Sequence, residues 1–195
     1  MTALPTKKYI SPEEYLATER DALEKHEYLN GEIFAMAGAK MAHVRICGNL
    51  SASLVQQLRN RDCQPFQSDL RTHIPTTGLY TYPDITVVCG KPELVPDGYL
   101  DTLLNPTLII EVLSPSTAEY DRGAKFDHYK TIDSLKEYVL VWQAKKRVAR
   151  HTRRDDDSWV LTDFIGDDSE IELVSIGCVL SMADIYEKVE NLPPQ

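Results

Sequence analysis

One stretch decides the fold of this 195-residue chain: Thr107-Leu108-Ile109-Ile110-Glu111-Val112-Leu113. Turn signals bound it, Asn105-Pro106 before and Ser114-Pro115 after. A continuous aliphatic run of this length predicts a strand that is buried on both faces of a sheet. Glu111 interrupts the run, and a buried carboxylate needs a cation, a metal or several hydrogen-bond donors. Taken alone, the stretch also fits a glutamate that points to water or pairs with an arginine.

A second predicted strand, Tyr82-Pro83-Asp84-Ile85-Thr86-Val87-Val88-Cys89, also carries an acid. Pro83 has no N–H for a sheet ladder, so it marks the strand entrance and leaves Asp84 as the first residue able to project. An aspartate in the turn that opens a strand is a common alternative. If the two strands are neighbours, Asp84 and Glu111 together offer the oxygen ligands that suit Mg²⁺.

Size and composition favour one globular domain with a substantial core, since 43% of residues are hydrophobic and 26% are charged. No apolar stretch approaches the roughly 18 residues that cross a bilayer. Residues 1–8 lack a signal-peptide core, so we expect a cytoplasmic protein without a membrane partner. The net charge of −9 argues against broad attraction to nucleic acid but leaves room for a local basic groove.

The four cysteines, Cys47, Cys63, Cys89 and Cys178, are far apart in the chain and form no Cys-x-x-Cys pair. This spacing predicts neither a zinc site nor a disulfide framework. Buried small hydrophobic side chains are the expected role.

The N-terminal part predicts a helix and a hairpin. Ser11 to Glu14 form a capping-box sequence for a helix that ends before Glu24. Residues 25–36 form a hairpin around Asn30-Gly31, which has the chemistry of a type I′ turn. Glu27 lies just before that turn, where a strand glutamate facing solvent is the simple explanation.

Helical spacing predicts the longest helix over residues 41–59, with His43 in its first turn as a structural histidine or a neighbour of the Glu27 hairpin. Short strands are expected within residues 63–74. Residues 91–105 form a longer loop with one short helical turn. Beyond Glu111, Asp121 is expected to cap a helix running to about residue 132.

In that helix, Asp121, Lys125 and Tyr129 share one face at four-residue spacing, although an Asp–Lys pair four residues apart is also an ordinary surface pair. Further on, the basic strand 147–152 fits a solvated edge strand or a phosphate-binding rim. The acidic run Asp155-Asp156-Asp157 beside it favours the edge strand.

The predicted fold class is α/β, with a central mixed sheet of about five strands, helices on both sides and antiparallel hairpins at the edges. Residues 136–180 are expected to form an antiparallel appendage, followed by a final short helix that Ser181 begins. The whole chain, residues 1–195, is one domain with a loose tail from about residue 187.

The order of these features resembles the restriction-endonuclease-like nuclease superfamily and, more narrowly, the Uma-two family of endonucleases. The similarity covers nearly the whole chain, from near residue 8 to near residue 185. Its most specific part is the run Glu111 to Thr117 followed by Asp121 and Lys125. The matching stretches are residues 25–32, His43, residues 82–88, residues 111–117 and residues 120–125.

The resemblance implies a catalytic set of Glu27, Asp84, Glu111 and Lys125. Asp84 and Glu111 would hold Mg²⁺, with Mn²⁺ as a substitute, and Glu27 would orient the metal or its water. Lys125 would stabilise phosphate charge or position the attacking water. This assignment agrees with the needs of phosphodiester hydrolysis, which are a metal-activated water and a cation near the phosphate oxygens.

This chain departs from the superfamily pattern at the position of the catalytic lysine. The superfamily pattern expects it two residues after the strand acid, where this chain has Leu113. The resemblance to the narrower family implies that the lysine has moved to the following helix, as Lys125 or, failing that, Lys130.

Two hypotheses follow. The first is a metal-dependent hydrolase, an endonuclease that cuts DNA and acts as a homodimer. The second is a catalytically inactive nuclease-fold module for binding or assembly, which Leu113 and the acidic net charge motivate. An unrelated metal hydrolase is less well supported, because the sequence shows no His/Cys metal cluster.

Overall fold

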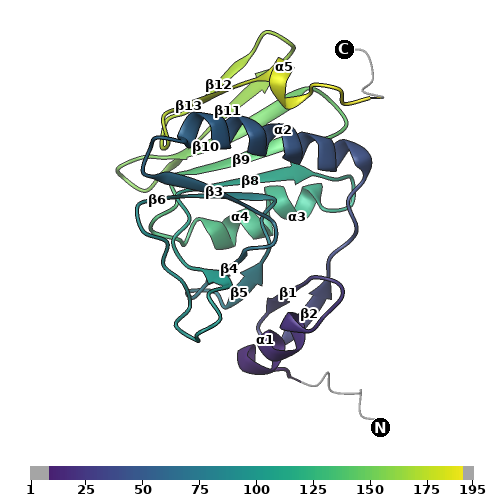
Figure 1. Ribbon diagram of the computed structural model, residues 1–195, viewed down its shortest axis with the longest axis vertical. Coiled ribbons are helices and arrows are strands. Elements are labelled where there is room, and N and C mark those ends of the chain that lie inside the picture. The colour runs from purple at the N-terminus through teal and green to yellow at the C-terminus, as the bar shows by residue number, and fades with distance from the viewer. Residues whose placement is uncertain (1–8, 191–195) are drawn as a thin grey trace.

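The computed structural model describes residues 9–190, and its elements form an upper and a lower lobe (Figure 1). The helices are α1 (Pro12–Arg20), α2 (Met41–Leu58), α3 (Ala118–Arg122), α4 (Ala124–Tyr129) and α5 (Met182–Ile185). The strands are β1 (His26–Leu29), β2 (Glu32–Ala35), β3 (Cys63–Gln67), β4 (Arg71–Ile74), β5 (Leu79–Thr81), β6 (Ile85–Cys89), β7 (Thr102–Leu103), β8 (Leu108–Leu113), β9 (Glu137–Trp142), β10 (Arg147–Arg153), β11 (Trp159–Ile165), β12 (Glu170–Leu173) and β13 (Cys178–Ser181). Across this range, no helix is both long enough and apolar enough to cross a bilayer.

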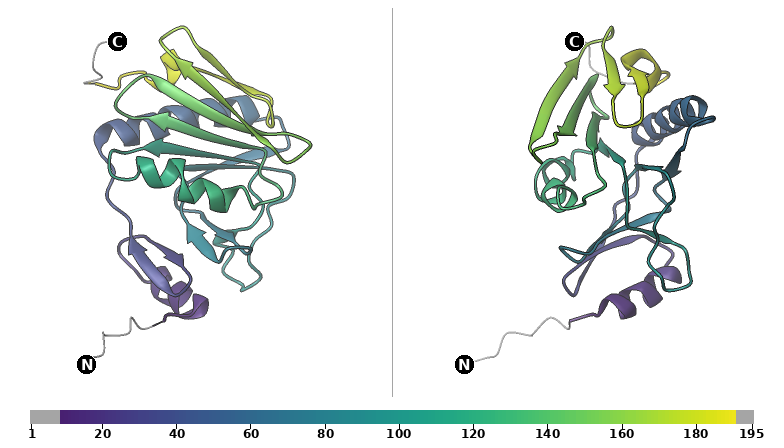
Figure 2. Two further views of the ribbon diagram at one scale, coloured as in Figure 1. Left: turned by 180° about the vertical axis from the view of Figure 1, so that it is seen from behind. Right: turned by 90° about the vertical axis from the view of Figure 1, so that its left-hand side faces the viewer.

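The upper lobe is built on a six-stranded sheet in the order β11-β10-β9-β8-β6-β3. The sheet is mixed, because β8 and β9 run parallel while the other neighbours are antiparallel. Every residue of β8 is buried, as the aliphatic run predicts. Helix α2 covers one face of the sheet, and α3 and α4 cover the other (Figure 2). The predicted mixed sheet with helices on both sides is confirmed.

Alternation along β8 decides which face each side chain joins. Ile110 and Val112 belong to the core that includes the apolar side of α2. Ile109 and Leu113 belong to the core that includes Phe126 of α4. Glu111 has the same parity as Ile109 and Leu113, so its carboxylate lies on the side of α3 and α4.

The lower lobe consists of α1 and a five-stranded sheet in the order β2-β1-β5-β4-β7. The predicted capping box is present, because Ser11 and Glu14 exchange side-chain-to-backbone hydrogen bonds. The predicted hairpin turn is present too, with φ of 49° at Asn30 and 93° at Gly31. Three buried tyrosines and one leucine make the core of this lobe: Tyr15, Tyr28, Tyr80 and Leu16.

Asp101 stabilises the lower lobe through two arginines, with Oδ2 lying 2.8 Å from Nε of Arg20 and 3.0 Å from a guanidinium nitrogen of Arg71. The hydrogen bond from Arg20 lowers the pKa of Asp101 to about 2. A lowered folded-state pKa contributes stability above the unfolded-state pKa, and this contribution disappears as the pH falls towards 2. Since Asp101 is partly exposed, we expect Asp101→Asn to lower the free energy of unfolding by about 1 kcal/mol at neutral pH.

Urea unfolding at pH 7 and at pH 2.5 checks this expectation, with wild type and variant compared at each pH. The difference between them should shrink at the lower pH. An equal difference at both pH values would contradict the assigned ion pairs.

The cysteine spacing predicts no disulfide, and this prediction is wrong. Cys63 on β3 and Cys89 on β6 lie directly opposite each other, and their sulfur atoms form a disulfide. The pairing follows from the register of two antiparallel strands, which places together two cysteines that are 26 residues apart in sequence. Spacing rules for cysteines carry no information about such a register.

The expected appendage over residues 136–180 is only partly present. Strands β9, β10 and β11 extend the central sheet, while β12 and β13 form a separate two-stranded sheet.

The edge-strand interpretation of the basic segment, residues 147–152, is wrong as well, because β10 lies between β9 and β11. Its arginines pair with local acids: Arg147 with Asp163 at 2.5 Å and Arg153 with Asp157 at 2.9 Å.

Two smaller expectations also differ, and a third is untested. The predicted helix from Asp121 is broken at Gly123 into α3 and α4, and Thr117 rather than Asp121 occupies its N-cap. Residues 91–105 contain β7 and a bridge between Leu94 and Leu103 in place of a helical turn. Residues 191–195 of the predicted tail lie outside the described range.

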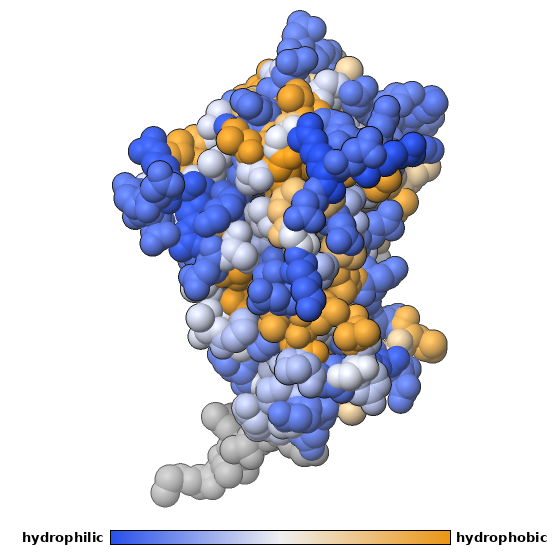
Figure 3. Space-filling view, turned by 60° about the vertical axis from the view of Figure 1, so that its left-hand side comes forward, coloured by the Kyte–Doolittle hydropathy of each residue, from blue (hydrophilic) through white to orange (hydrophobic). Residues whose placement is uncertain are grey.

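The surface is mixed on the face shown in Figure 3, where hydrophilic side chains dominate the upper part and hydrophobic ones gather in the lower half. Exposed hydrophobic side chains also occur on the outer side of α2, including Met41, Val44 and Val55. A surface of this kind is ordinary for a folded protein.

Candidate active site

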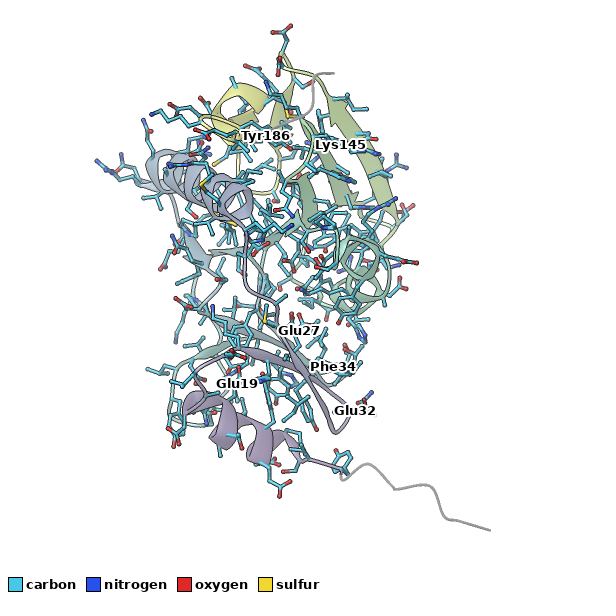
Figure 4. The ribbon with its side chains drawn as sticks, turned by 90° about the vertical axis from the view of Figure 1, so that its right-hand side faces the viewer. Glu19, Glu27, Glu32, Phe34, Lys145 and Tyr186 are labelled. Carbon is cyan, nitrogen blue, oxygen red and sulfur yellow. A yellow bond between two sulfur atoms is a disulfide. The ribbon has the colours of Figure 1, made fainter. Side chains whose placement is uncertain are left out.

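Lys125 lies at the centre of a buried cluster of acids. Its Nζ is 2.9 Å from Oε1 of Glu111, 3.1 Å from Oε1 of Glu27 and 3.5 Å from Oδ1 of Asp121. These residues come from four different elements, and Lys125 is only 4% exposed. Glu27 belongs to the lower lobe and lies on its side nearest the upper lobe (Figure 4). One ammonium group therefore connects the two lobes.

The spacing of residues on α3 and α4 explains how Lys125 reaches Glu111. Asp121, Lys125 and Tyr129 face the sheet despite the break at Gly123. The Tyr129 hydroxyl donates to Oε1 of Glu111 at 2.9 Å, the same oxygen that contacts Lys125. The predicted shared face is thus observed, and it is buried rather than a surface pair.

Asp84 joins the cluster through the backbone. It lies immediately before β6, and its N–H donates to Oε2 of Glu111 at 3.3 Å. In return, Oδ2 of Asp84 accepts a hydrogen bond from the N–H of Val112 at 2.7 Å. The two acids are therefore adjacent, as the neighbouring strands β6 and β8 require.

On its other side, Asp84 contacts α2. Nε2 of His43 lies 3.1 Å from Oδ2 of Asp84, and Sγ of Cys47 lies 3.6 Å from Nδ1 of His43. The sequence predicts that His43 is structural or lies near the Glu27 hairpin, and the structure places it against Asp84. Cys47 was missed as a neighbour of the site, although its four-residue spacing from His43 on a predicted helix was an available signal.

Lys130, the alternative lysine, lies outside the cluster. Its Nζ pairs with Asp127 at 2.5 Å, and the side chain is 37% exposed. Leu113, at the usual lysine position, is buried in the hydrophobic core on the α4 side. Of the two candidate lysines, only Lys125 contacts the predicted acids.

The cluster contains more acidic than basic side chains. Glu27, Asp84, Glu111 and Asp121 supply four carboxyl groups around the one ammonium of Lys125. Burial raises the pKa of Glu111 to about 8, against the opposing effect of Lys125, and burial also raises the pKa of Asp121. Burial lowers the pKa of Lys125, but Glu111 and the other acids outweigh this effect and raise it well above its ordinary value.

The oxygen donors of this cluster fit a hard dication. Oδ1 of Asp84 accepts no hydrogen bond from residues 9–190, and Oε2 of Glu111 accepts only the long one from Asp84. Mg²⁺ prefers such carboxylate oxygens, and its charge would favour the ionised form of the buried acids. Asp84 and Glu111 are therefore the residues of this site that could hold Mg²⁺.

A mixed sheet with helices on both faces agrees with the restriction-endonuclease-like fold class expected from the sequence. Residues 12–183 match the model of the Uma2 family, described as "Putative restriction endonuclease", and the chain belongs to this family.

Two curated relatives from Synechocystis sp. (strain ATCC 27184 / PCC 6803 / Kazusa) are similar along most of their length. "Uncharacterized protein sll1609" is 38% identical over 88% of this chain and 97% of its own. "Uncharacterized protein slr1290" is 37% identical over 91% of each chain. A crystal structure from Anabaena variabilis ATCC 29413, described as a putative nuclease belonging to DUF820, matches with a TM-score of 0.74. It is 19% identical, and the match covers 92% of this chain and 99% of that one. This last likeness establishes the fold.

Proposed function

We propose that the chain is a Mg²⁺-dependent endonuclease that hydrolyses phosphodiester bonds in DNA. The observation that carries the proposal is the buried contact of Lys125 with Glu27 and Glu111, next to Asp84. Membership of a family whose description is "Putative restriction endonuclease" and the nuclease-like fold support it. Mn²⁺ is expected to replace Mg²⁺.

In this proposal each residue has a separate task. Asp84 and Glu111 hold the metal, which when bound lowers the pKa of a water molecule and neutralises phosphate charge. Lys125 offers its ammonium group to the non-bridging oxygens of the phosphate, where charge develops. Glu27 orients Lys125, because its Oε1 contacts Nζ and accepts a hydrogen bond from the Thr81 hydroxyl.

Cleavage of both strands of a duplex calls for two such sites, so we propose a homodimer as the working form. Light scattering of the purified protein, with and without a DNA duplex, measures this directly. A monomeric mass under both conditions would contradict it.

The proposed function is tested by incubating the purified chain with supercoiled plasmid and Mg²⁺ or Mn²⁺. We expect cutting that a chelator stops and that Asp84→Ala reduces by at least about tenfold, because one metal ligand is lost. Asp163→Ala is the matched control, since Asp163 pairs with Arg147 on β10. Equal cutting by Asp84→Ala would overturn the proposal. Failure of the wild type to cut DNA substrates would favour the inactive binding module.

A further inference from the structure

A second group of metal-ligating side chains lies beside the proposed hydrolytic site. His43, Cys47 and Asp84 each offer one donor atom, and these atoms lie within 4.8 Å of one another. Only Asp84 has a role in the proposed hydrolysis. The imidazole and the thiol have none, although both face the same carboxylate.

Helix α2 positions two of the three donors. His43 and Cys47 are four residues apart, so they lie on one face of the helix, one turn from each other. The face is directed at the segment before β6, where Nε2 of His43 lies 3.1 Å from Oδ2 of Asp84. The side chains of His43 and Asp84 are 16% and 18% exposed, which leaves them within reach of an ion from solvent.

We propose that His43, Cys47 and Asp84 bind a transition-metal dication such as Zn²⁺ or Co²⁺. The set supplies one nitrogen, one sulfur and one oxygen, which leaves a fourth tetrahedral position for water. A thiolate and an imidazole favour Zn²⁺ or Co²⁺ over Mg²⁺, whereas the Asp84–Glu111 pair has oxygen donors alone. Binding displaces one proton from the Cys47 thiol, which becomes the thiolate ligand.

A simpler account would make the three side chains a hydrogen-bonded relay that holds Asp84 in place. That relay needs His43 but not Cys47, since Nε2 of His43 alone reaches Asp84. The two accounts differ in whether the sulfur of Cys47 ever contacts a metal.

Cobalt distinguishes them, because a thiolate bound to Co²⁺ gives a strong charge-transfer absorption in the near ultraviolet. The full chain is titrated with Co²⁺ in the absence of added thiols, so that the Cys63–Cys89 disulfide stays intact. We expect one Co²⁺ per chain with this absorption, and Zn²⁺ should displace it. The measurement needs no DNA, so it remains decisive if the proposed hydrolysis fails.

Cys47→Ser is expected to abolish the charge-transfer band and to weaken Co²⁺ binding by more than about tenfold, and His43→Gln to weaken it similarly. Cys178→Ser is the matched control, because Cys178 is the other cysteine outside the disulfide and should leave the band unchanged. Glu111→Gln should also keep the band, which separates this site from the oxygen-donor pair. Circular dichroism verifies that each variant is folded.

Three results would overturn the inference. They are the absence of saturable Co²⁺ binding by the wild type, a charge-transfer band that survives in folded Cys47→Ser, and loss of the band in folded Glu111→Gln.

Discussion

Lys125→Met is expected to lower DNA cleavage by at least about a hundredfold and the free energy of unfolding by about 3 kcal/mol. Cleavage falls because the only cation in contact with Glu27 and Glu111 is removed from the described site, and one lost electrostatic group of this kind costs about 10²–10³ in rate. Stability falls because the buried acids lose their shared partner. Methionine keeps most of the volume, so packing contributes little to the loss.

Lys130→Met is the matched control. Lys130 belongs to the same segment but is partly exposed and pairs with Asp127. We expect it to change stability by less than about 1 kcal/mol and to leave cleavage unchanged. Urea unfolding and plasmid cleavage are measured for both variants below the temperature at which Lys125→Met unfolds. Undiminished cleavage by folded Lys125→Met would remove Lys125 from the mechanism.

Glu137→Ala is expected to lower the free energy of unfolding by about 3 kcal/mol. Glu137 is fully buried in β9, and its carboxylate accepts hydrogen bonds from the backbone N–H groups of Val174 and Ser175 at 3.2 and 2.9 Å. The Ser175 hydroxyl donates to it as well, and Arg150 lies 3.7 Å away. The substitution leaves these partly buried donors without their acceptor.

The loss should be concentrated in the hairpin of β12 and β13, because the turn that Glu137 anchors joins these two strands. Urea unfolding gives the size of the effect, and hydrogen exchange over residues 170–181 gives its location. Glu170→Ala, at an exposed position of β12, is the control and should have little effect. A loss below about 1 kcal/mol for Glu137→Ala would contradict the anchoring role.

Local patterns were sufficient for the elements that position the site. The aliphatic run of β8, the Asn30-Gly31 turn and the helical spacing of α2 each report on residues close in sequence, and all three appear as expected. The same patterns failed at the break after Arg122. A single glycine, Gly123, interrupts a segment in which the spacing of Asp121, Lys125 and Tyr129 predicts one continuous helix.

Contacts between distant residues could not be predicted from periodicity. The disulfide of Cys63 and Cys89 depends on strand register, and the contact of His43 with Asp84 depends on how α2 packs on the sheet. Resemblance to a family grouped Glu27 with Lys125, but the sequence pattern around Glu27 is that of an ordinary strand glutamate. Only the folded chain shows that Glu27 and Glu111 both contact the ammonium group of Lys125.

The position of Glu27 has a mechanical consequence. Its strand, β1, belongs to the five-stranded sheet, whereas Glu111 lies on β8 of the six-stranded sheet and Lys125 lies on α4. A rotation of one sheet relative to the other would therefore withdraw one carboxylate from the ammonium and leave the other in place. The affinity of Lys125 for an incoming anion would rise as the sheets separate. A large anion that separates the sheets on binding would therefore release Lys125 from Glu27.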